Sequence, residues 1–468
     1  MIRPLLGVPL IFLIYLIPSV SLAESGGAAV DLRYHWVGYY TLIVTVLSYV
    51  VAMTEDLHHM SKAKPMVLGA ALAWFAIFIE QTLRTGDGGG LTHVFEMDLA
   101  TYAELFLFIT VSMTFLNALT ERHVFDVLRI RIEAWHLSYR QLFWITGSMA
   151  FLLSLVVSSL TVGLLMGYII LSLAQKNVRF AGMAGLNAVV AANAGGTVSP
   201  LGGISTFFVW QQGALQFGEF FTLLIPCVIN FVIPGLLMHF AIDAGKPEPS
   251  GDQRVLKRGS LGVLVIFIMT FSITVLANVF LSMPAVLGMM FGLGILQTYA
   301  YYLIVTEPRD AKEEEKAIDI VKCVAGVDWD TLLFFYGAMM IIGALNYIGY
   351  LSTLAQMLFH EMSPTLANIL IGLSSSSIDN GTLMYAVLEM HPTFPKIEWL
   401  LLTLTLGVGG SLLAIGSAPG LHVLGLMKDR LGGGRGYTFT LHLRWAPAVL
   451  LGFFGAVFAL QMLKGGLW

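Results

Sequence analysis

A polar stretch interrupts an otherwise apolar chain at residues 374–382, where the sequence reads SSSSIDNGT. Asp379 supplies a carboxylate, Asn380 an amide and Thr382 a hydroxyl, and oxygen atoms of these kinds are the ligands that hard cations take. An acid inside an apolar segment is costly, so its usual role is to bind an ion or a substrate. The alternative is that Asp379 caps the N-terminus of the helix that follows it.

A second polar stretch lies in the middle of the apolar segment 142–174. Its polar residues are Ser158, Ser159 and Thr161. Arg or Lys residues flank both ends of this segment, which predicts a re-entrant hairpin that enters and leaves a membrane on the same side. Segment 363–395 has the same design, with Asp379 at its tip, and its ends are predicted to lie on the opposite side. Glu389 and His391 flank its return and are interpreted as interfacial.

Each predicted hairpin is followed by a span that small and polar residues interrupt, at 185–213 and at 398–426. Irregular backbone inside a membrane is tolerated only where protein or a water-filled cavity surrounds it. We therefore expect two broken helices whose ends meet the hairpin tips near the midplane, in an inverted repeat. The further candidate ion- or substrate-binding residues at these tips and breaks are Ser377, Asn193, Ser199, Ser205, Thr206, Ser411 and Ser417.

The composition places these segments in a membrane protein. Of 468 residues, 57% are hydrophobic and only 12% are charged, whereas soluble domains carry about 25% charged residues. We predict an all-α polytopic membrane protein with about 10 transmembrane helices, two re-entrant hairpins and two broken helices. The predicted spans are 36–53, 66–83, 101–119, 185–213, 218–241, 260–281, 283–305, 329–349, 398–426 and 446–463. The net charge of −4 gives no basic surface for a nucleic-acid partner.

The predicted domain organisation has a signal peptide, two halves and a linker. The boundaries are 1–23 for the signal peptide, 24–305 for the first half, 306–328 for a cytoplasmic linker and 329–468 for the second half. Arg3, a short apolar core and small residues make the first segment a signal-peptide pattern, with an uncleaved first helix as the alternative.

The distribution of Lys and Arg predicts the orientation of the chain. These residues gather in loops 120–140, 242–259 and 427–445, which should be cytoplasmic. Loop 84–100 is mostly acidic or neutral and should lie outside. The chain is then a multi-pass protein of the inner membrane, with its mature N-terminus outside.

Glu104 is an acid inside the predicted span 101–119. Such a position favours a functional role, here proton coupling beside Asp379. Because Glu104 lies near the outer end of the span, a structural ion pair is the alternative.

Several longer stretches resemble NhaD-type sodium/proton antiporters of the ion transporter superfamily. They are residues 35–65, 103–129, 193–202 (NAGGTVSPLG), 331–345, 379–382 (DNGT) and 409–420 (GGSLLAIGSAPG). The resemblance implies a sodium site between two repeats, and exchange of Na⁺ or Li⁺ outward for protons inward. It also implies an elevator-like movement of the hairpins and a homodimer. We expect no cofactor and no catalytic residue.

The chain departs from this family at two positions. The family's first tip usually reads Asp-Asn-x-Thr, but here it reads Ser158-Ser159-Leu160-Thr161, and a further acid of the family is replaced by Gly203. The site that the resemblance implies then holds Na⁺ at Asp379, Asn380 and Thr161. Because these two carboxylates are missing, proton exchange would depend on the remaining acids.

Three classes of function stay open on the sequence. The first is the cation/proton antiporter. The second is a sodium- or proton-coupled carrier of a carboxylate or oxyanion, which the loss of negative charge favours and the absence of Arg or Lys from both broken helices opposes. The third is an intramembrane enzyme, which no His-Glu-x-x-His or Gly-x-Ser-x-Gly motif supports.

Overall fold

The regular secondary structure of the chain is helical. In a computed structural model, the described residues are 31–55, 60–86, 89–175, 177–247, 254–308, 316–431 and 435–464, and these contain no β-strand. The predicted signal peptide, 1–23, lies outside them. The prediction of an all-α polytopic membrane protein is confirmed.

Two compact units can be distinguished within the chain, and each combines segments that are distant in sequence. Unit 1 consists of the described residues within 1–106, 328–367 and 382–394, and unit 2 of those within 107–327, 368–381 and 395–468. Both units take residues from each predicted half of the chain.

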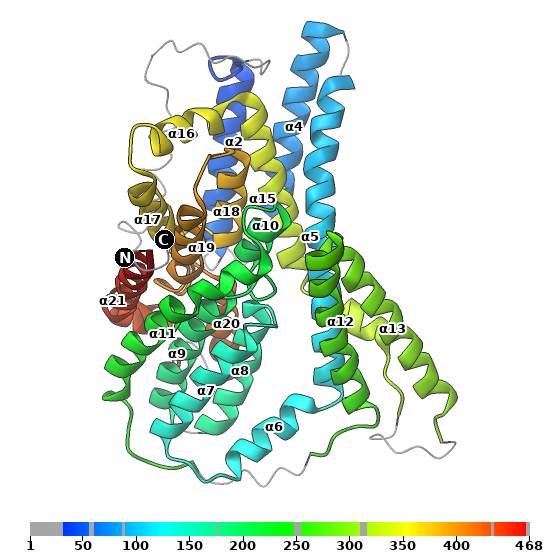
Figure 1. The fold of residues 1–468 in the computed structure, drawn as a ribbon, viewed down its shortest axis with the longest axis vertical. Coiled ribbons are helices and arrows are strands. Elements are labelled where there is room, and N and C mark those ends of the chain that lie inside the picture. Colours follow the sequence, from blue (N-terminus) through cyan, green and yellow to red (C-terminus); the bar gives the residue numbers. More distant parts are fainter. Residues whose placement is uncertain are drawn as a thin grey trace. The chain divides into compact units, whose positions relative to one another are not determined.

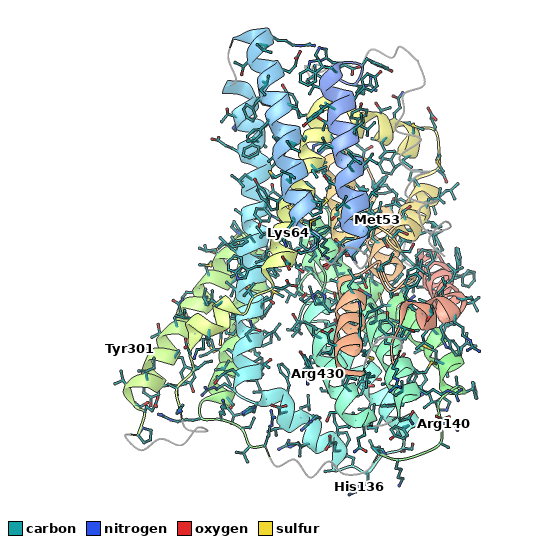
Figure 2. The ribbon with its side chains drawn as sticks, turned by 180° about the vertical axis from the view of Figure 1, so that it is seen from behind. Met53, Lys64, His136, Arg140, Tyr301 and Arg430 are labelled. Atoms are coloured by element: carbon teal, nitrogen blue, oxygen red, sulfur yellow. The ribbon has the colours of Figure 1, made fainter. Side chains whose placement is uncertain are left out.

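In unit 1, three helices pack side by side (Figure 1). They are α2 (Trp36–Met53), α4 (Ala63–Thr85) and α15 (Trp329–Ile348). Met53 and Lys64 lie at the same end of the antiparallel pair α2 and α4 (Figure 2). The indole nitrogen of Trp74 donates a hydrogen bond to the carbonyl of Met340 at 2.8 Å, which ties α4 to α15.

Unit 1 also takes parts of helices that continue beyond it. It includes the first part of α5 (Gly89–Glu121), the whole of α16 (Tyr350–Phe359), the start of α17 (Pro364–Ser374) and most of α18 (Asn380–Glu389). The loop predicted at 84–100 is therefore wrong from Gly89 onward, where the chain is already helical. The run of glycines before it favours a loop, but the apolar residues after it continue the helical period of the following span.

Unit 2 contains the remaining helices of the described chain. They are α6 (Val124–Glu133), α7 (Tyr139–Leu153), α8 (Ser159–Ala174), α9 (Val178–Thr197), α10 (Ile204–Gln211), η1 (Phe217–Leu223), α11 (Leu224–His239), α12 (Ser260–Leu281), α13 (Ala285–Val305), α14 (Ile320–Ala325), α19 (Lys396–Gly409), α20 (Ala418–Leu431) and α21 (Phe439–Lys464). Helix α9 is central, since it contacts α7, α8, α11 and α19. His136 lies in the turn between α6 and α7, and Arg140 lies in the first turn of α7 (Figure 2).

Eight helices of the described chain are long and apolar enough to cross a membrane. They are Trp36–Met53, Ala63–Arg84, Gly90–Glu121, Phe217–His239, Ser260–Leu281, Ala285–Val305, Trp329–Ile348 and Phe439–Leu463. The other two predicted spans, 185–213 and 398–426, are interrupted helices: α9 ends at Thr197 before α10, and α19 ends at Gly409 before α20.

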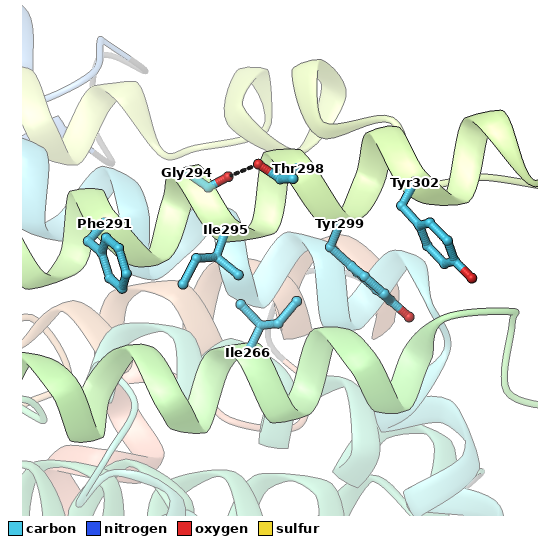
Figure 3. Close-up of a pocket in the computed structure, with 7 residues that line it drawn as sticks. All are labelled: Ile266, Phe291, Gly294, Ile295, Thr298, Tyr299 and Tyr302. Carbon is cyan, nitrogen blue, oxygen red and sulfur yellow. Dashed lines mark hydrogen bonds between the residues drawn. The ribbon is translucent and has the colours of Figure 1, made fainter.

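Helices α12 and α13 pair closely (Figure 1), and large apolar side chains such as Ile268, Phe280 and Phe291 are exposed on them. A groove of about 670 Å³ runs along this pair (Figure 3). Its lining is Ile266, Phe291, Gly294, Ile295, Thr298, Tyr299 and Tyr302. The Thr298 hydroxyl donates to the Gly294 carbonyl at 2.8 Å, so this hydroxyl is compatible with an apolar environment.

A buried arginine joins three segments of unit 2 beyond the end of α5. The side chain of Arg122 is only 1% exposed and pairs with Glu121. Its guanidinium donates to the carbonyls of Arg258 at 3.1 Å and Lys316 at 2.7 Å. Asp319 caps the start of α14, since its carboxylate accepts a hydrogen bond from the backbone N–H of Lys322. This bond lowers the pKa of Asp319.

We predict that Arg122→Met destabilises the protein, because the substitution removes a buried guanidinium and leaves the carbonyls of Arg258 and Lys316 without their donor. The expected loss is on the order of 2 kcal/mol or more. Thermal unfolding of the purified protein in detergent measures it. Arg254→Met is the matched control, since this exposed residue pairs with Asp126 at the surface and its loss should cost about 1 kcal/mol or less. Equal midpoints for both variants would contradict the anchoring role of Arg122.

Candidate functional site

The tip of the second hairpin holds the carboxylate that the sequence singled out. Asp379 lies directly before α18, and its Oδ2 atom accepts a hydrogen bond from the backbone N–H of Gly381 at 3.0 Å. Asp379 therefore caps this helix, as the alternative interpretation predicted. A cap does not exclude ion binding, because the N-terminus of a helix also favours a charged carboxylate there.

The serines before Asp379 differ in what their hydroxyls do. Ser375 is buried, and its hydroxyl lies 2.8 Å from the carbonyl of Gly372 and 3.1 Å from that of Leu406 on α19. The hydroxyls of Ser376 and Ser377 lie 3.5 Å apart, and both residues are partly exposed. Ser375 thus fixes the hairpin against the broken helix, whereas Ser377 lies toward the tip.

The first hairpin ends in hydroxyl groups that the structure leaves available. Ser158 precedes α8 but makes no side-chain capping bond. The backbone N–H of Ser159 donates to the carbonyl of Gly202 at 2.8 Å, which holds this tip against the first break. Within the described residues, the hydroxyls of Thr161 and Ser154 are buried without a hydrogen-bond partner. Buried polar atoms without a hydrogen-bond partner in the protein are uncommon, and a water molecule or an ion is one way to satisfy them.

The two broken helices are joined by a direct side-chain contact. The Asn193 amide on α9 donates to the Ser417 hydroxyl at 2.8 Å, and Ser417 lies at the end of the second break. Both residues are buried. The structure therefore brings these two predicted site residues together, although they are distant in sequence.

Other predicted site residues satisfy the backbone at the breaks. The Thr206 hydroxyl lies 2.9 Å from the carbonyl of Ser199 and 2.8 Å from that of Gly203. Ser199 accepts from the backbone N–H of Leu201 at 3.2 Å. The hydroxyl of Ser411 donates to the Val408 carbonyl at 2.6 Å. These side chains stabilise the irregular backbone of the breaks.

The remaining predicted site residues differ in their surroundings. Ser205 and Thr382 are buried in the first turns of α10 and α18, whereas Asn380 is partly exposed at the start of α18. Glu104 is partly exposed on α5 and belongs to unit 1. Glu104 therefore does not belong to the same compact unit as Asp379 and the broken-helix residues.

Glycines place the two hairpins against the two breaks in the same way. A Cβ atom added to Gly195 would collide with the carbonyl of Phe151, and one added to Gly409 would collide with that of Gly372. Further along, a Cβ on Gly196 would lie 2.9 Å from the Gly202 carbonyl. The matching Cβ on Gly410 would lie 3.0 Å from the Gly416 carbonyl.

This correspondence aligns the two repeats residue by residue. Seven residues after Phe151 comes Ser158, and seven after Gly372 comes Asp379. Ser158 therefore occupies in the first hairpin the position that Asp379 occupies in the second. By the same count from Gly195 and Gly409, Gly203 corresponds to Ser417.

A buried histidine that the sequence analysis did not single out supports the second break. His442 is fully buried on α21, and its Nε2 atom lies 2.9 Å from the carbonyl of Ser411. Because a carbonyl only accepts, Nε2 carries the proton, and Nδ1 accepts from the Tyr437 hydroxyl at 2.6 Å. The predicted span 446–463 leaves residue 442 in a loop, whereas α21 begins at Phe439.

Comparisons with known proteins give a consistent family assignment. A family model described as citrate transporter matches residues 49–407. A Na⁺/H⁺ antiporter NhaD of Alkalimonas amylolytica is 39% identical over 464 residues, which are 95% of this chain and 94% of the relative. The NhaD antiporter of Vibrio cholerae is 38% identical over 458 residues, 94% of each chain. Sodium/proton antiporter 1 of Arabidopsis thaliana is 26% identical over 359 residues, 73% of this chain and 60% of the relative.

We predict that His442→Ala destabilises the protein more than Tyr437→Phe. The alanine leaves both the Ser411 carbonyl and the Tyr437 hydroxyl buried without partners, at roughly 1–3 kcal/mol each. The phenylalanine removes only one of the two bonds. Thermal unfolding of both variants in the same detergent compares them. A His442→Ala variant with the wild-type midpoint would show that this histidine does not hold the break.

Proposed function

This chain belongs to the family of NhaD Na⁺/H⁺ antiporters, and from that premise we propose that it exchanges Na⁺ or Li⁺ for protons. It is a multi-pass membrane protein and a transporter rather than an enzyme. The proposed mechanism is alternating access with an elevator-like movement of the hairpins. The direction is cation outward and proton inward across the inner membrane.

The observation that carries the proposal is the position of Asp379 at the start of a helix within a polar hairpin tip. Its carboxylate faces the backbone N–H groups of the first turn of α18 and accepts from Gly381. A carboxylate in such a place binds either a cation or a proton, and the two exclude each other. Competition for one carboxylate is the simplest way to couple Na⁺ to protons.

Hydroxyl and amide oxygens supply the rest of the proposed sodium site. Thr161 has a buried hydroxyl without a hydrogen-bond partner in the described structure, and Asn380 follows Asp379 directly. Na⁺ is a hard cation, and neutral oxygen ligands serve hard cations. We propose that Thr161 and Asn380 join Asp379 as ligands, with the broken-helix residues Asn193 and Ser417 beside them.

The two hairpin tips differ in one carboxyl group. Ser158 stands at the position that corresponds to Asp379, so the second hairpin keeps an acid that the first hairpin lacks. A site with fewer negative charges binds a cation less tightly. We therefore propose a lower cation affinity than a site with acids in both hairpins would have.

The topology and assembly are proposals that rest on charge and exposure. Lys and Arg concentrate in the segments 120–140, 242–259 and 427–445, which we place on the cytoplasmic side, so the mature N-terminus lies outside. A homodimer would use the exposed apolar face of α12 and α13, the pair that carries the groove of Figure 3. Glu104 is kept as a second candidate for proton coupling, on α5.

An anion carrier is the second candidate function. The family model that matches residues 49–407 is described as citrate transporter, and the first tip carries no acid. A carboxylate could then be held by hydroxyls and helix N-termini. Na⁺- and Li⁺-induced collapse of an imposed pH gradient in proteoliposomes separates the two: the antiporter gives a cation-dependent collapse, whereas the anion carrier gives none and takes up citrate instead.

We predict that Asp379→Asn abolishes cation-induced proton movement in this assay while the protein still inserts and folds. Asparagine can still accept a bond from Gly381 and cap α18, so the helix should persist. It cannot exchange a proton or offer a charge. The thermal midpoint of the variant serves as the folding control. Wild-type turnover in Asp379→Asn would remove Asp379 from the mechanism.

We predict that Ser158→Asp raises the apparent affinity for Na⁺ by about tenfold, because it adds a carboxylate at the position that corresponds to Asp379 (about 1.4 kcal/mol). The concentration of Na⁺ at half-maximal exchange measures the change. Ser138→Asp is the matched control: Ser138 caps α7 on the exposed surface, and Asp caps equally well. An unchanged affinity in Ser158→Asp would place Ser158 outside the site.

A further inference from the structure

Unit 1 contains a cluster of two carboxyl groups and a phenol that the proposed sodium site does not use. Asp98 on α5 is buried, with 7% of its surface exposed. Its Oδ1 atom accepts from the Tyr385 hydroxyl on α18 at 3.3 Å. The same hydroxyl also contacts Glu389, one turn further along α18. Asp98 and Glu389 are thus connected through a single hydroxyl.

The second oxygen of Asp98 has no hydrogen-bond partner within the described residues. This Oδ2 atom is buried and lies against Gly343 on α15, where an added Cβ atom would collide with it. A charged carboxylate with a buried oxygen and no donor is strongly unfavourable, because it loses its hydration without replacement. A protonated carboxyl group avoids this cost.

Glu389 has the partners that Asp98 lacks. The Asn346 amide on α15 donates to its Oε2 atom at 2.8 Å. His391 also acts on Glu389 from the residues after α18, and its positive form would stabilise the anion. The polar groups that face one another in the cluster are Asp98, Tyr385, Glu389, Asn346 and His391. They include no lysine or arginine from the described chain.

The number of protons in the cluster follows from its hydrogen bonds. A tyrosine hydroxyl donates only one proton, so it cannot donate to both carboxylates at once. Two carboxylates that meet at one hydroxyl repel each other, which favours a proton on one of them. One additional proton removes this conflict: once Asp98 is protonated, its bond with Tyr385 reverses, so that Asp98 donates to Tyr385 and Tyr385 donates to Glu389.

We propose that Asp98, Tyr385 and Glu389 form a proton-binding site in unit 1, separate from the sodium site. The ligand is one proton, taken from water onto the Asp98 carboxylate at low pH and returned to water as the pH rises. Tyr385 and Glu389 lie on α18, the helix that Asp379 caps. A charge that appears in this cluster therefore acts on the same helix as the exchanging carboxylate, and sets the pH range of exchange.

Infrared difference spectroscopy of the purified full-length protein, titrated from mildly acidic to alkaline pH, tests the site directly. We expect the carbonyl band of a protonated carboxyl group in the wild type, its loss as the pH rises, and its absence from Asp98→Asn. Glu96→Gln is the control: Glu96 lies exposed on the same helix, and its removal should leave the band. An unchanged band in Asp98→Asn would overturn the proposal.

Two further variants test the site in case Asp98→Asn does not fold. Tyr385→Phe and Glu389→Gln should shift the pH at which the band disappears, because each removes a partner of the shared proton. An unchanged titration in both would also overturn the site.

The transport readout rests on the proposed function, whereas the infrared readout does not. In proteoliposomes, Asp98→Asn should shift the pH of half-maximal Na⁺-dependent proton movement, and Glu96→Gln should not. A wild type without exchange would remove the antiporter proposal and leave the infrared result intact. An infrared band assigned to Asp98 with an unchanged transport profile would overturn the role in setting the pH range.

Discussion

Backbone groups at the two helix breaks must find partners inside the protein, because a membrane offers them no water. The structure meets this requirement with a small number of contacts. The carbonyl of Gly202 accepts from the N–H of Ser159, that of Leu406 accepts from the Ser375 hydroxyl, and that of Ser411 accepts from His442. Each contact ties a break to a different element, so the breaks can be irregular and still be fixed in place.

Close approach of backbone to backbone makes this arrangement possible. Gly195 and Gly409 each lie against a carbonyl of the preceding hairpin, where a side chain would not fit. Because the same contact occurs in both repeats, each hairpin tip lies in the same way against the break that follows it. The tips can then differ in chemistry without a change in geometry, and the chain has Ser158 in one and Asp379 in the other. The proposed shift in cation affinity is a consequence of that single difference.

Scarcity of charge gives each buried acid a distinct role. Asp379 lies at a helix N-terminus, where its carboxylate accepts a hydrogen bond from the backbone of Gly381. Asp98 has no such support, and one of its oxygens has no partner within the described structure. Backbone hydrogen bonding therefore supports the carboxylate of Asp379, whereas Asp98 is the acid proposed to hold a proton. An exchanger that couples cations to protons needs one acid that binds the cation and can use a second acid that responds to pH.

Segment composition and polarity were sufficient to predict the membrane class and the helix interruptions at the tips and breaks. Periodicity and local polarity encode them: the tip at Ser158 lies between α7 and α8, and the break predicted in 185–213 lies between Thr197 and Ile204. The prediction of a loop at 84–100 is wrong from Gly89 onward, where α5 begins. The glycines at this point indicate a loop, and the prediction gave them more weight than the helical period of the residues that follow.

Contacts over long sequence separation were decided only by the tertiary structure. Asp98 meets Tyr385 across 287 residues, and Asn193 meets Ser417 across 224. His442 reaches Ser411 across 31 residues. No local pattern specifies such pairs, since each depends on how helices pack against one another. The sequence alone determined the polar residues at the tips and breaks, because local polarity within apolar segments marks them. Packing decided which of them meet, and it also brought in Asp98, Tyr385 and His442, which no local pattern had marked.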